Sequence, residues 1–91
     1  MKRSREMIIS QILDVCANGA HKTKIVYQAN LNFRTISPYL DLLIRNGLLD
    51  SEGDSDEGRL VTYRTTTKGR NLLNDLREIQ DELRPDEPIT A

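Results

Sequence analysis

The spacing of the apolar side chains changes at Gly47, and this change sets the order of the expected elements. Before Gly47, apolar residues recur every three or four positions in three segments, 4–18, 22–29 and 33–46. This spacing is typical of helices that bury one face. After Gly47, residues 60–65 are rich in β-branched and aromatic side chains with alternating polar positions, a pattern that predicts a strand.

A second strand and a last helix complete the expected order. Leu48 and Leu49 form a short apolar pair, and the polar, acidic stretch 51–58 that follows reads as an exposed loop. Together with 60–65 they predict a two-stranded hairpin. Helical spacing returns over 67–83, with Thr66 as the expected N-cap. The predicted order is therefore helix, helix, helix, hairpin, helix.

The start of the third helix is open, because Pro38 lies inside it. A proline in a helix interior removes a hydrogen bond and clashes one turn back. Either the helix begins near Asn32, with Pro38 past the first turn, or it begins late, with Ser37 as N-cap and Pro38 as its first residue. We favour the early start. The ends of the first and third helices are clearer, since Gly19 and Gly47 follow them.

Three helices followed by a two-stranded wing are the order of a winged helix-turn-helix, so the expected fold class is α+β. The 91 residues suffice for one domain. We expect the winged-helix domain over 1–66, a C-terminal helix over 67–84 and a flexible tail over 85–91.

Several classes of protein do not fit this composition. No apolar run approaches a membrane span, and no apolar block follows the basic start, so we expect a cytoplasmic location. The single cysteine, Cys16, is expected to be a small buried hydrophobe. One histidine, His21, has no metal-ligand partner at useful spacing and is interpreted as a turn or capping residue. We predict no enzyme activity, metal, cofactor or small-molecule substrate.

The charge is unevenly distributed along the chain. The net charge is −1, but residues 1–50 carry seven Lys or Arg against four Asp or Glu, a net +3, whereas residues 51–91 carry six against ten, a net −4. A local field counts for more in binding than the total charge. The basic half of the chain, residues 1–50, includes the second and third helices.

These helices and the wing strand carry the predicted contacts to double-stranded DNA. A recognition helix over about 33–46 would read base edges in the major groove, while basic residues elsewhere clamp phosphates. The predicted DNA-binding residues are Lys22, Thr23, Lys24, Asn32, Arg34, Thr35, Ser37, Tyr39, Arg59 and Arg64. Four simpler interpretations stay open: Asn32 as an N-cap, Arg34 as a plain solvated charge, Tyr39 as half-buried packing, and 22–24 as an ordinary solvated face.

The wing tip is not expected to enter a groove. Four acidic side chains crowd it and would repel DNA: Glu52, Asp54, Asp56 and Glu57. Contacts from the wing would then come from its strand.

The last helix has an apolar stripe at spacings of four, three and four: Leu72, Leu76, Ile79 and Leu83. This is a coiled-coil seam two heptads long. Its first half can pack on its own domain, but Ile79 and Leu83 lie too far along to reach it. The stripe therefore predicts a homodimer through the last helix.

Three segments carry a family resemblance. Residues 31–49, which run from a polar helical start to Gly-Leu-Leu, resemble the recognition-helix segment of prokaryotic winged-helix regulators. Residues 63–73 resemble the Tyr-x-Leu-Thr-x-Lys-Gly-x-x-Leu-Leu passage from wing to last helix, with Thr65 where leucine is usual. Residues 22–32 are similar to a group of small archaeal winged-helix DNA-binding proteins that dimerise through a C-terminal helix. The resemblance implies DNA binding.

Two functions of different class remain. One is a DNA-binding transcriptional regulator or chromatin-associated protein, favoured by the polar and basic first turns of the third helix. The other is a winged-helix protein–protein interaction module without DNA binding. The acidic second half of the chain favours this alternative.

Overall fold

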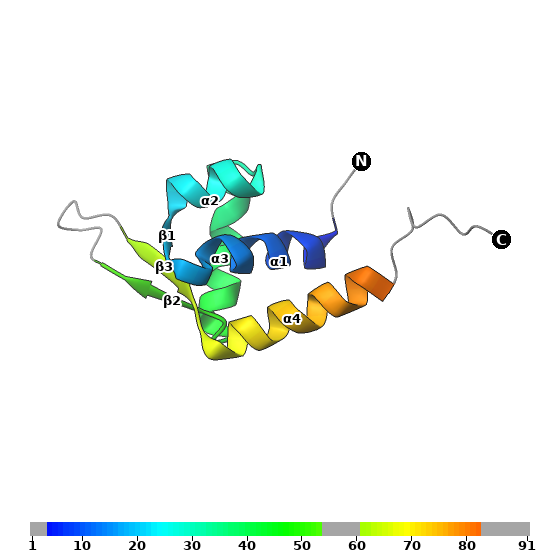
Figure 1. The fold of residues 1–91 in the computed structure, drawn as a ribbon. Coiled ribbons are helices and arrows are strands. Elements are labelled where there is room, and N and C mark those ends of the chain that lie inside the picture. The colour runs from blue at the N-terminus through cyan, green and yellow to red at the C-terminus, as the bar shows by residue number, and fades with distance from the viewer. Residues whose placement is uncertain (1–3, 54–60, 83–91) are drawn as a thin grey trace.

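The computed structural model describes residues 4–53 and 61–82 of the chain (Figure 1). Its elements are the helices and strands α1 (Arg5–Val15), a 3-10 turn η1 (Cys16–Asn18), β1 (Ala20–His21), α2 (Lys22–Ala29), α3 (Phe33–Arg45), β2 (Leu49–Glu52), β3 (Thr62–Thr65) and α4 (Thr67–Glu82). The α+β winged-helix order predicted from the sequence is confirmed. Arg59, Leu83, the tail and the acidic residues of the wing tip after Gly53 lie outside the described residues.

The early start of α3 is confirmed. Asn32 has an extended backbone, and its Oδ1 accepts a hydrogen bond of 2.7 Å from the backbone N–H of Thr35, which is N-cap geometry. Pro38 lies inside the helix as its sixth residue. One residue earlier, the Ser37 hydroxyl donates to the carbonyl of Phe33 at 3.1 Å. Thr66 also caps as predicted, since its Oγ1 accepts from the Gly69 N–H at 3.0 Å.

The sheet has a strand that the sequence did not predict. Its order is β1-β3-β2, all antiparallel, with Ala20 opposite Tyr63 and Leu49 opposite Thr65. Two residues are too few to show a strand period, so β1 was missed. His21 occupies the N-cap position of α2, in line with the interpretation as a turn or capping residue. Its side chain makes no capping hydrogen bond, and its Nδ1 lies 3.1 Å from the Val61 carbonyl oxygen.

The core lies where α1, α2 and α3 meet the sheet. Each helix contributes fully buried apolar side chains, and Leu49 and Leu73 join them from β2 and α4. The helical residues of this set with no exposed surface are Ile12, Leu13, Ile25 and Ile36. Cys16 is also fully buried, and this burial raises the pKa of its thiol to about 12. The prediction that Cys16 is a small buried hydrophobe is confirmed.

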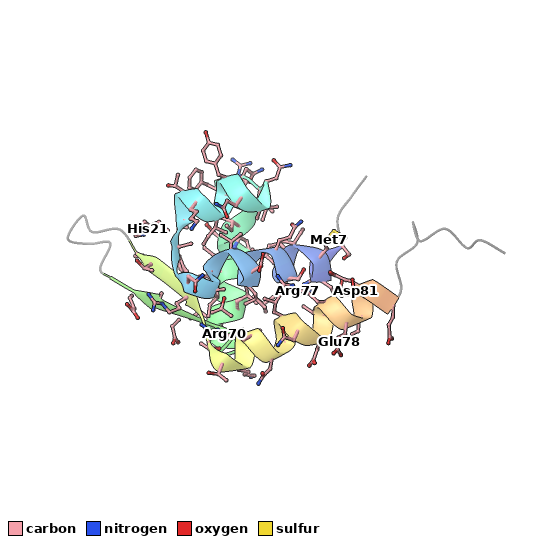
Figure 2. The ribbon with its side chains drawn as sticks, in the orientation of Figure 1. Met7, His21, Arg70, Arg77, Glu78 and Asp81 are labelled. Atoms are coloured by element: carbon pink, nitrogen blue, oxygen red, sulfur yellow. The ribbon has the colours of Figure 1, made fainter. Side chains whose placement is uncertain are left out.

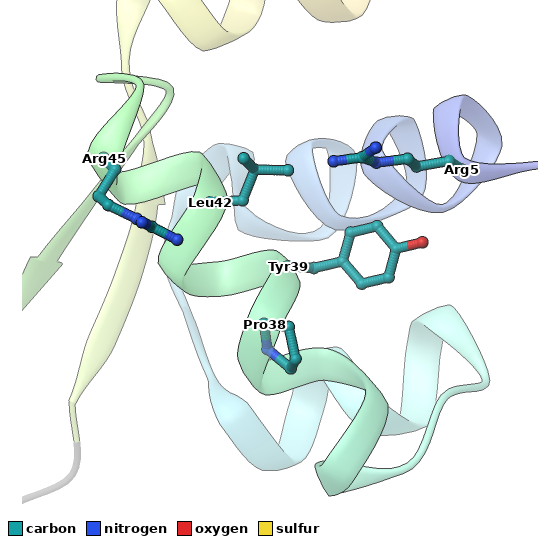
Figure 3. Close-up of a pocket in the computed structure, with 5 residues that line it drawn as sticks. All are labelled: Arg5, Pro38, Tyr39, Leu42 and Arg45. Atoms are coloured by element: carbon teal, nitrogen blue, oxygen red, sulfur yellow. The ribbon is translucent and has the colours of Figure 1, made fainter.

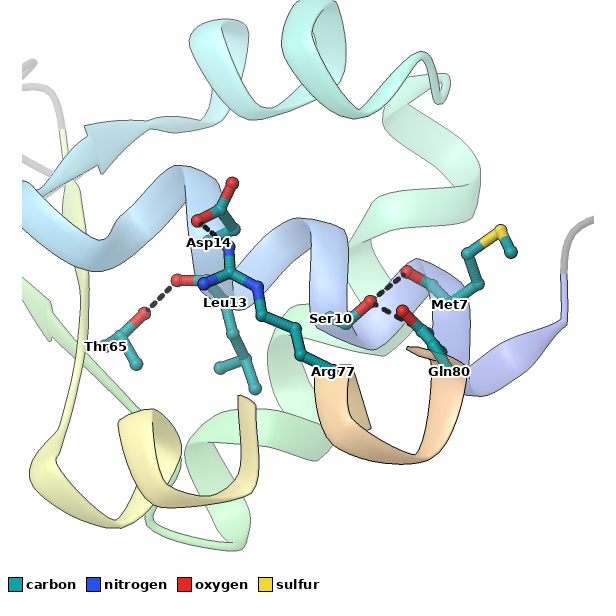
Figure 4. Close-up of polar contacts among 7 residues, drawn as sticks. All are labelled: Met7, Ser10, Leu13, Asp14, Thr65, Arg77 and Gln80. Atoms are coloured by element: carbon teal, nitrogen blue, oxygen red, sulfur yellow. Dashed lines mark hydrogen bonds and ion pairs between the residues drawn. The ribbon is translucent and has the colours of Figure 1, made fainter. Parts of the chain in front are cut away.

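α4 runs along α1, so that α1 lies between α2 and α4 (Figure 1). Polar contacts join the two helices at Ser10 and Asp14 of α1 (Figure 4). Arg77 forms an ion pair with Asp14, and Gln80 donates to the Ser10 hydroxyl at 3.4 Å. From the sequence, only Ile79 and Leu83 of this helix were expected to lie too far along to reach their own domain. Ile79, between the contacting residues Arg77 and Gln80, is 52% exposed.

A close approach at Gly69 sets the start of α4. This glycine is buried in the first turn of the helix. A Cβ at Gly69 would overlap the carbonyl oxygen of Leu48 and would lie 2.7 Å from Cγ2 of Thr65. The same Thr65 is buried and donates its hydroxyl to the Leu13 carbonyl at 2.7 Å (Figure 4). The absence of a side chain at Gly69 thus lets α4 begin directly against the sheet.

We predict that Gly69→Ala destabilises the fold by about 1–3 kcal/mol, the usual cost of overpacking. The direction of this stability change is informative, because alanine otherwise stabilises a helix interior by about 1 kcal/mol relative to glycine. Chemical denaturation followed by circular dichroism measures the free energy of unfolding of each protein. Asn74→Ala, at an exposed site of the same helix, is the control and should be neutral or slightly stabilising. A Gly69→Ala protein as stable as the original would contradict the close approach.

Candidate nucleic-acid interface

α3 turns one face into the core and the opposite face to solvent. Its inner face is defined by the buried residues Ile36, Leu40 and Leu43. Its outward face is a stripe at spacings of four, three and four: Arg34, Pro38, Asp41 and Arg45, all exposed. Within the described residues, Arg34 and Arg45 have no hydrogen bond or ion pair with the protein. Two arginines are therefore free to bind an external group from one side of a single helix.

The start of α2 supplies further polar groups. Thr23 and Lys24 are exposed, and Lys24 has no hydrogen bond or ion pair within residues 4–53 and 61–82. Lys22 is half-buried instead, and its Nζ donates to the Ser37 hydroxyl at 3.4 Å. Because His21 makes no side-chain cap, the first N–H groups of α2 lack a side-chain acceptor. A helix N-terminus in this state favours a negatively charged group.

Three of the predicted contact residues at the start of α3 and within it have contacts inside the protein: Asn32, Ser37 and Tyr39. Asn32 caps the helix, as the simpler interpretation held. Ser37 links Phe33 and Lys22 through its hydroxyl. Thr35 is half-buried, and Tyr39 is half-buried and packs against the core. The structure thus brings Arg34 to the outward face, engages the side chains of Asn32, Ser37 and Tyr39 within the fold, and leaves Thr35 half-buried.

Arg64 is exposed on β3, on the opposite side of the strand from the buried Thr65. Its guanidinium lies against the backbone of Gly19, where Nη2 would be 3.1 Å from a Cβ at that position. It forms no hydrogen bond within the part of the chain that the structure describes.

The cations of α4 differ from those of α2 and α3, because each of them is bound to the protein. Lys68 donates to the carbonyl of Asn46 at 2.8 Å, and Arg70 donates to the carbonyl of Ala17 at 3.2 Å. Arg77 lies between α4 and α1, where it pairs with Asp14, while Glu78 projects on the side of α4 away from α1 (Figure 2). The cations of α4 are therefore less available to a partner than Lys24, Arg34 and Arg45 on α2 and α3.

Comparison with known proteins agrees with this geometry. A family model described as winged helix-turn-helix matches residues 2–84. The chain belongs to the winged helix-turn-helix family. An uncharacterised protein of Methanocaldococcus jannaschii is 34% identical over 79 residues, which cover 86% of this chain and 74% of that protein.

Two solved structures share the fold. Sso10a-2, a DNA-binding protein from Sulfolobus solfataricus, superposes with a TM-score of 0.80 at 28% identity, over 88% of this chain and 81% of that one. The PcaV transcriptional regulator from Streptomyces coelicolor superposes with a TM-score of 0.66 at 27% identity, over 92% of this chain and 62% of that one. The resemblance to small archaeal winged-helix proteins is confirmed at the level of the family.

Within this winged helix-turn-helix, α2 and α3 are the two helices joined by the turn, and β2 and β3 form the wing. The exposed residues of these helices that were not among the predicted contacts include Tyr27, Phe33 and Arg45. Tyr27 is 83% exposed and Phe33 is 52% exposed, on either side of the turn. The same periodicity that places Ile25, Val26 and Ala29 inward directs Tyr27 outward, and Arg45 is three turns from Arg34. The outward positions of Tyr27 and Arg45 could therefore have been predicted from the sequence.

We predict that Asn32→Ala destabilises the domain by about 1 kcal/mol through loss of the α3 cap. Asn32→Ser retains a capping oxygen and should restore most of that loss. Thermal denaturation measures both variants, with Asn71→Ala on the exposed surface of α4 as the control. An Asn32→Ala protein of unchanged stability would mean that the side chain does not cap the helix in solution.

Proposed function

We propose that this protein binds double-stranded DNA as a transcriptional regulator, with α3 in the major groove. The observation that carries the proposal is the outward face of α3, where Arg34 and Arg45 are exposed and have no partner within the described residues. An α-helix fits the major groove, and an arginine there can bind both acceptors of a guanine edge. The alternative, a protein–protein adaptor, gives no comparable reason for two free arginines on one helical stripe.

Position along α3 suggests the role of each side chain. Residues near the start of a recognition helix approach base edges, so we assign Arg34 to base reading. Asp41 on the same stripe can accept from a cytosine amino group. Arg45, at the end of the helix, is assigned to a phosphate. Thr23 and Lys24 at the start of α2 are placed to hold the adjacent strand.

The comparisons support this assignment. Sso10a-2, at 28% identity, is described as a DNA-binding protein, and PcaV, at 27% identity, as a transcriptional regulator. The role we propose is binding, without a catalytic step or a cofactor. No group of three or more His, Cys, Asp or Glu within the described residues could hold a metal ion. The described helices are also too short or too polar to cross a membrane. A cytoplasmic location is part of the proposal, because a regulator acts where the DNA lies.

We predict binding to duplex DNA that weakens steeply with salt. Each neutralised phosphate contributes about −0.9 to the slope of log K against log salt concentration. Fluorescence anisotropy with a labelled duplex of mixed sequence, at a series of salt concentrations, measures this slope. No binding at low salt, or binding that salt leaves unchanged, would favour the adaptor function.

Variants separate the proposed roles. Arg34→Ala should reduce the preference between DNA sequences, at about 1–3 kcal/mol per lost base contact. Lys24→Ala should weaken all sequences alike, because phosphate contacts carry no sequence information. Arg70→Ala is the matched control, since it removes the same charge from an arginine held by Ala17 on α4. If Arg34→Ala behaves like Arg70→Ala, α3 does not read the bases.

We further propose that the protein is a homodimer through α4. Leu72 and Leu76 of its apolar stripe are half-buried, and Leu72 packs against the core, whereas Ile79 is 52% exposed. Leu83, which the sequence places on the same stripe, lies outside the described residues. A 91-residue chain gains stability by covering such a face with a second copy. Two-fold pairing would set two α3 helices on one duplex, about one helical turn or a multiple of it apart.

Ile79→Glu should therefore give a monomer and weaken DNA binding, because each half-site alone buries little surface. Light scattering at matched concentrations reports the mass, and circular dichroism should show that the domain remains folded. Asn74→Glu is the control, because it adds the same charge to an exposed site on another side of α4. A monomeric mass for the unmodified protein would overturn the dimer.

A further inference from the structure

A pocket of about 340 Å³ lies between the start of α1 and the outward side of α3 (Figure 3). Four of its lining residues come from α3 and one from α1: Pro38, Tyr39, Leu42, Arg45 and Arg5. Its volume falls at the lower end of the range for small-molecule sites. Of these residues, only Tyr39 was assigned a function in the sequence analysis, and there as a DNA contact.

The pocket combines an apolar wall with two cations. The rings of Pro38 and Tyr39 and the side chain of Leu42 supply the apolar surface, and Tyr39 is held in place because it packs against the core. Arg5 and Arg45 approach Leu42 from opposite sides (Figure 3). Such a mixture of apolar lining and a few convergent polar groups is typical of sites that bind organic molecules.

Neither arginine is neutralised by the protein. Within residues 4–53 and 61–82, Arg5 and Arg45 have no hydrogen bond or ion pair. The adjacent acids Glu6 and Asp41 are exposed and do not pair with them. Two like charges thus line one small concave site, and an anion placed between them would gain charge-assisted hydrogen bonds.

We propose that this pocket binds a small organic anion with a flat, apolar body. The carboxylate or phosphate of the ligand would bind the guanidinium groups of Arg5 and Arg45, and its flat body would lie against Tyr39 and Leu42. A simple inorganic ion would satisfy the arginines but would leave the apolar wall uncovered. The chemistry of the pocket therefore favours an organic anion over free phosphate.

A bound anion would also act on the proposed DNA interface, a step that rests on the proposed function. Pro38 and Arg45 belong both to the pocket and to the outward face of α3. An anion held by Arg45 cancels positive charge on the surface that would meet the duplex. Ligand and DNA are therefore expected to compete.

The test is an NMR titration of the full 91-residue protein with sodium benzoate as the probe. The expected result is saturable shifts of amide signals in the second half of α3 and at the start of α1. Arg45→Ala and Arg5→Ala should each weaken the affinity about tenfold, through loss of charge-assisted hydrogen bonds. Both residues are exposed, so neither variant should unfold the domain, which circular dichroism checks. Arg34→Ala, the matched control on the same helix outside the pocket, should leave the benzoate affinity unchanged.

Two further probes test the ligand class. Benzyl alcohol, which has the ring without the charge, should not bind measurably. Inorganic phosphate should bind more weakly than benzoate. Absence of saturable benzoate shifts would overturn the pocket, and so would equal affinity for benzoate in the Arg45→Ala protein. Phosphate binding as tight as benzoate binding would overturn the apolar part of the site.

The DNA assay repeated with saturating benzoate separates this inference from the proposed function. A loss of DNA affinity that disappears in the Arg5→Ala protein would support the competition, because Arg5 lines the pocket without belonging to the outward stripe of α3. Benzoate binding without any DNA binding would contradict the proposed function and would still support the proposed ligand pocket. DNA affinity unaffected by bound benzoate would overturn the competition alone.

Discussion

Burial of the inner face of α3 is the constraint on which the presented surface depends. Ile36, Leu40 and Leu43 can be buried together in only one rotation of the helix, and this rotation sends Arg34 and Arg45 to solvent. The two arginines are eleven residues apart, so they stand about 16 Å from each other along one rigid element. The hydrophobic core thereby fixes the spacing of the surface charges, and the Asn32 cap fixes where the helix begins.

Some cationic side chains are bound within the protein and others are left exposed, and this division explains how a chain with a net charge of −1 can present a basic face. Lys68 and Arg70 donate to the carbonyls of Asn46 and Ala17, at the C-terminal ends of α3 and η1, where the helix dipole favours positive charge. Arg77 is paired with Asp14. The positive charge of α4 therefore serves the fold, whereas Lys24, Arg34 and Arg45 on α2 and α3 remain for a partner, as do Arg5 on α1 and Arg64 on β3. The total charge conceals this division, because it counts both kinds alike.

The sequence predicted the four helices, the wing strands and the cap of α4, because each follows from periodicity or from local capping chemistry. It did not predict β1, whose two residues show no period and pair with β3 some forty positions away. It also did not predict that Gln80 reaches Ser10, since side chains 70 residues apart meet only after α4 has folded back along α1. The meeting of Arg5 with Arg45 in one pocket is missed for the same reason. Periodicity and capping can be predicted from a single sequence, whereas contacts between residues far apart in that sequence cannot.

α1 is the element that connects the two proposed surfaces. Its first residue, Arg5, lines the pocket on α3, and its next turns contact α4 through Ser10 and Asp14. A helix of eleven residues behaves as one rigid body, so its position relative to α3 and its position relative to α4 are not independent. A ligand between α1 and α3 therefore acts on the same element that supports the proposed dimer helix. In a dimer through α4, the orientation of α1 against α3 would also determine how far apart the two α3 helices stand.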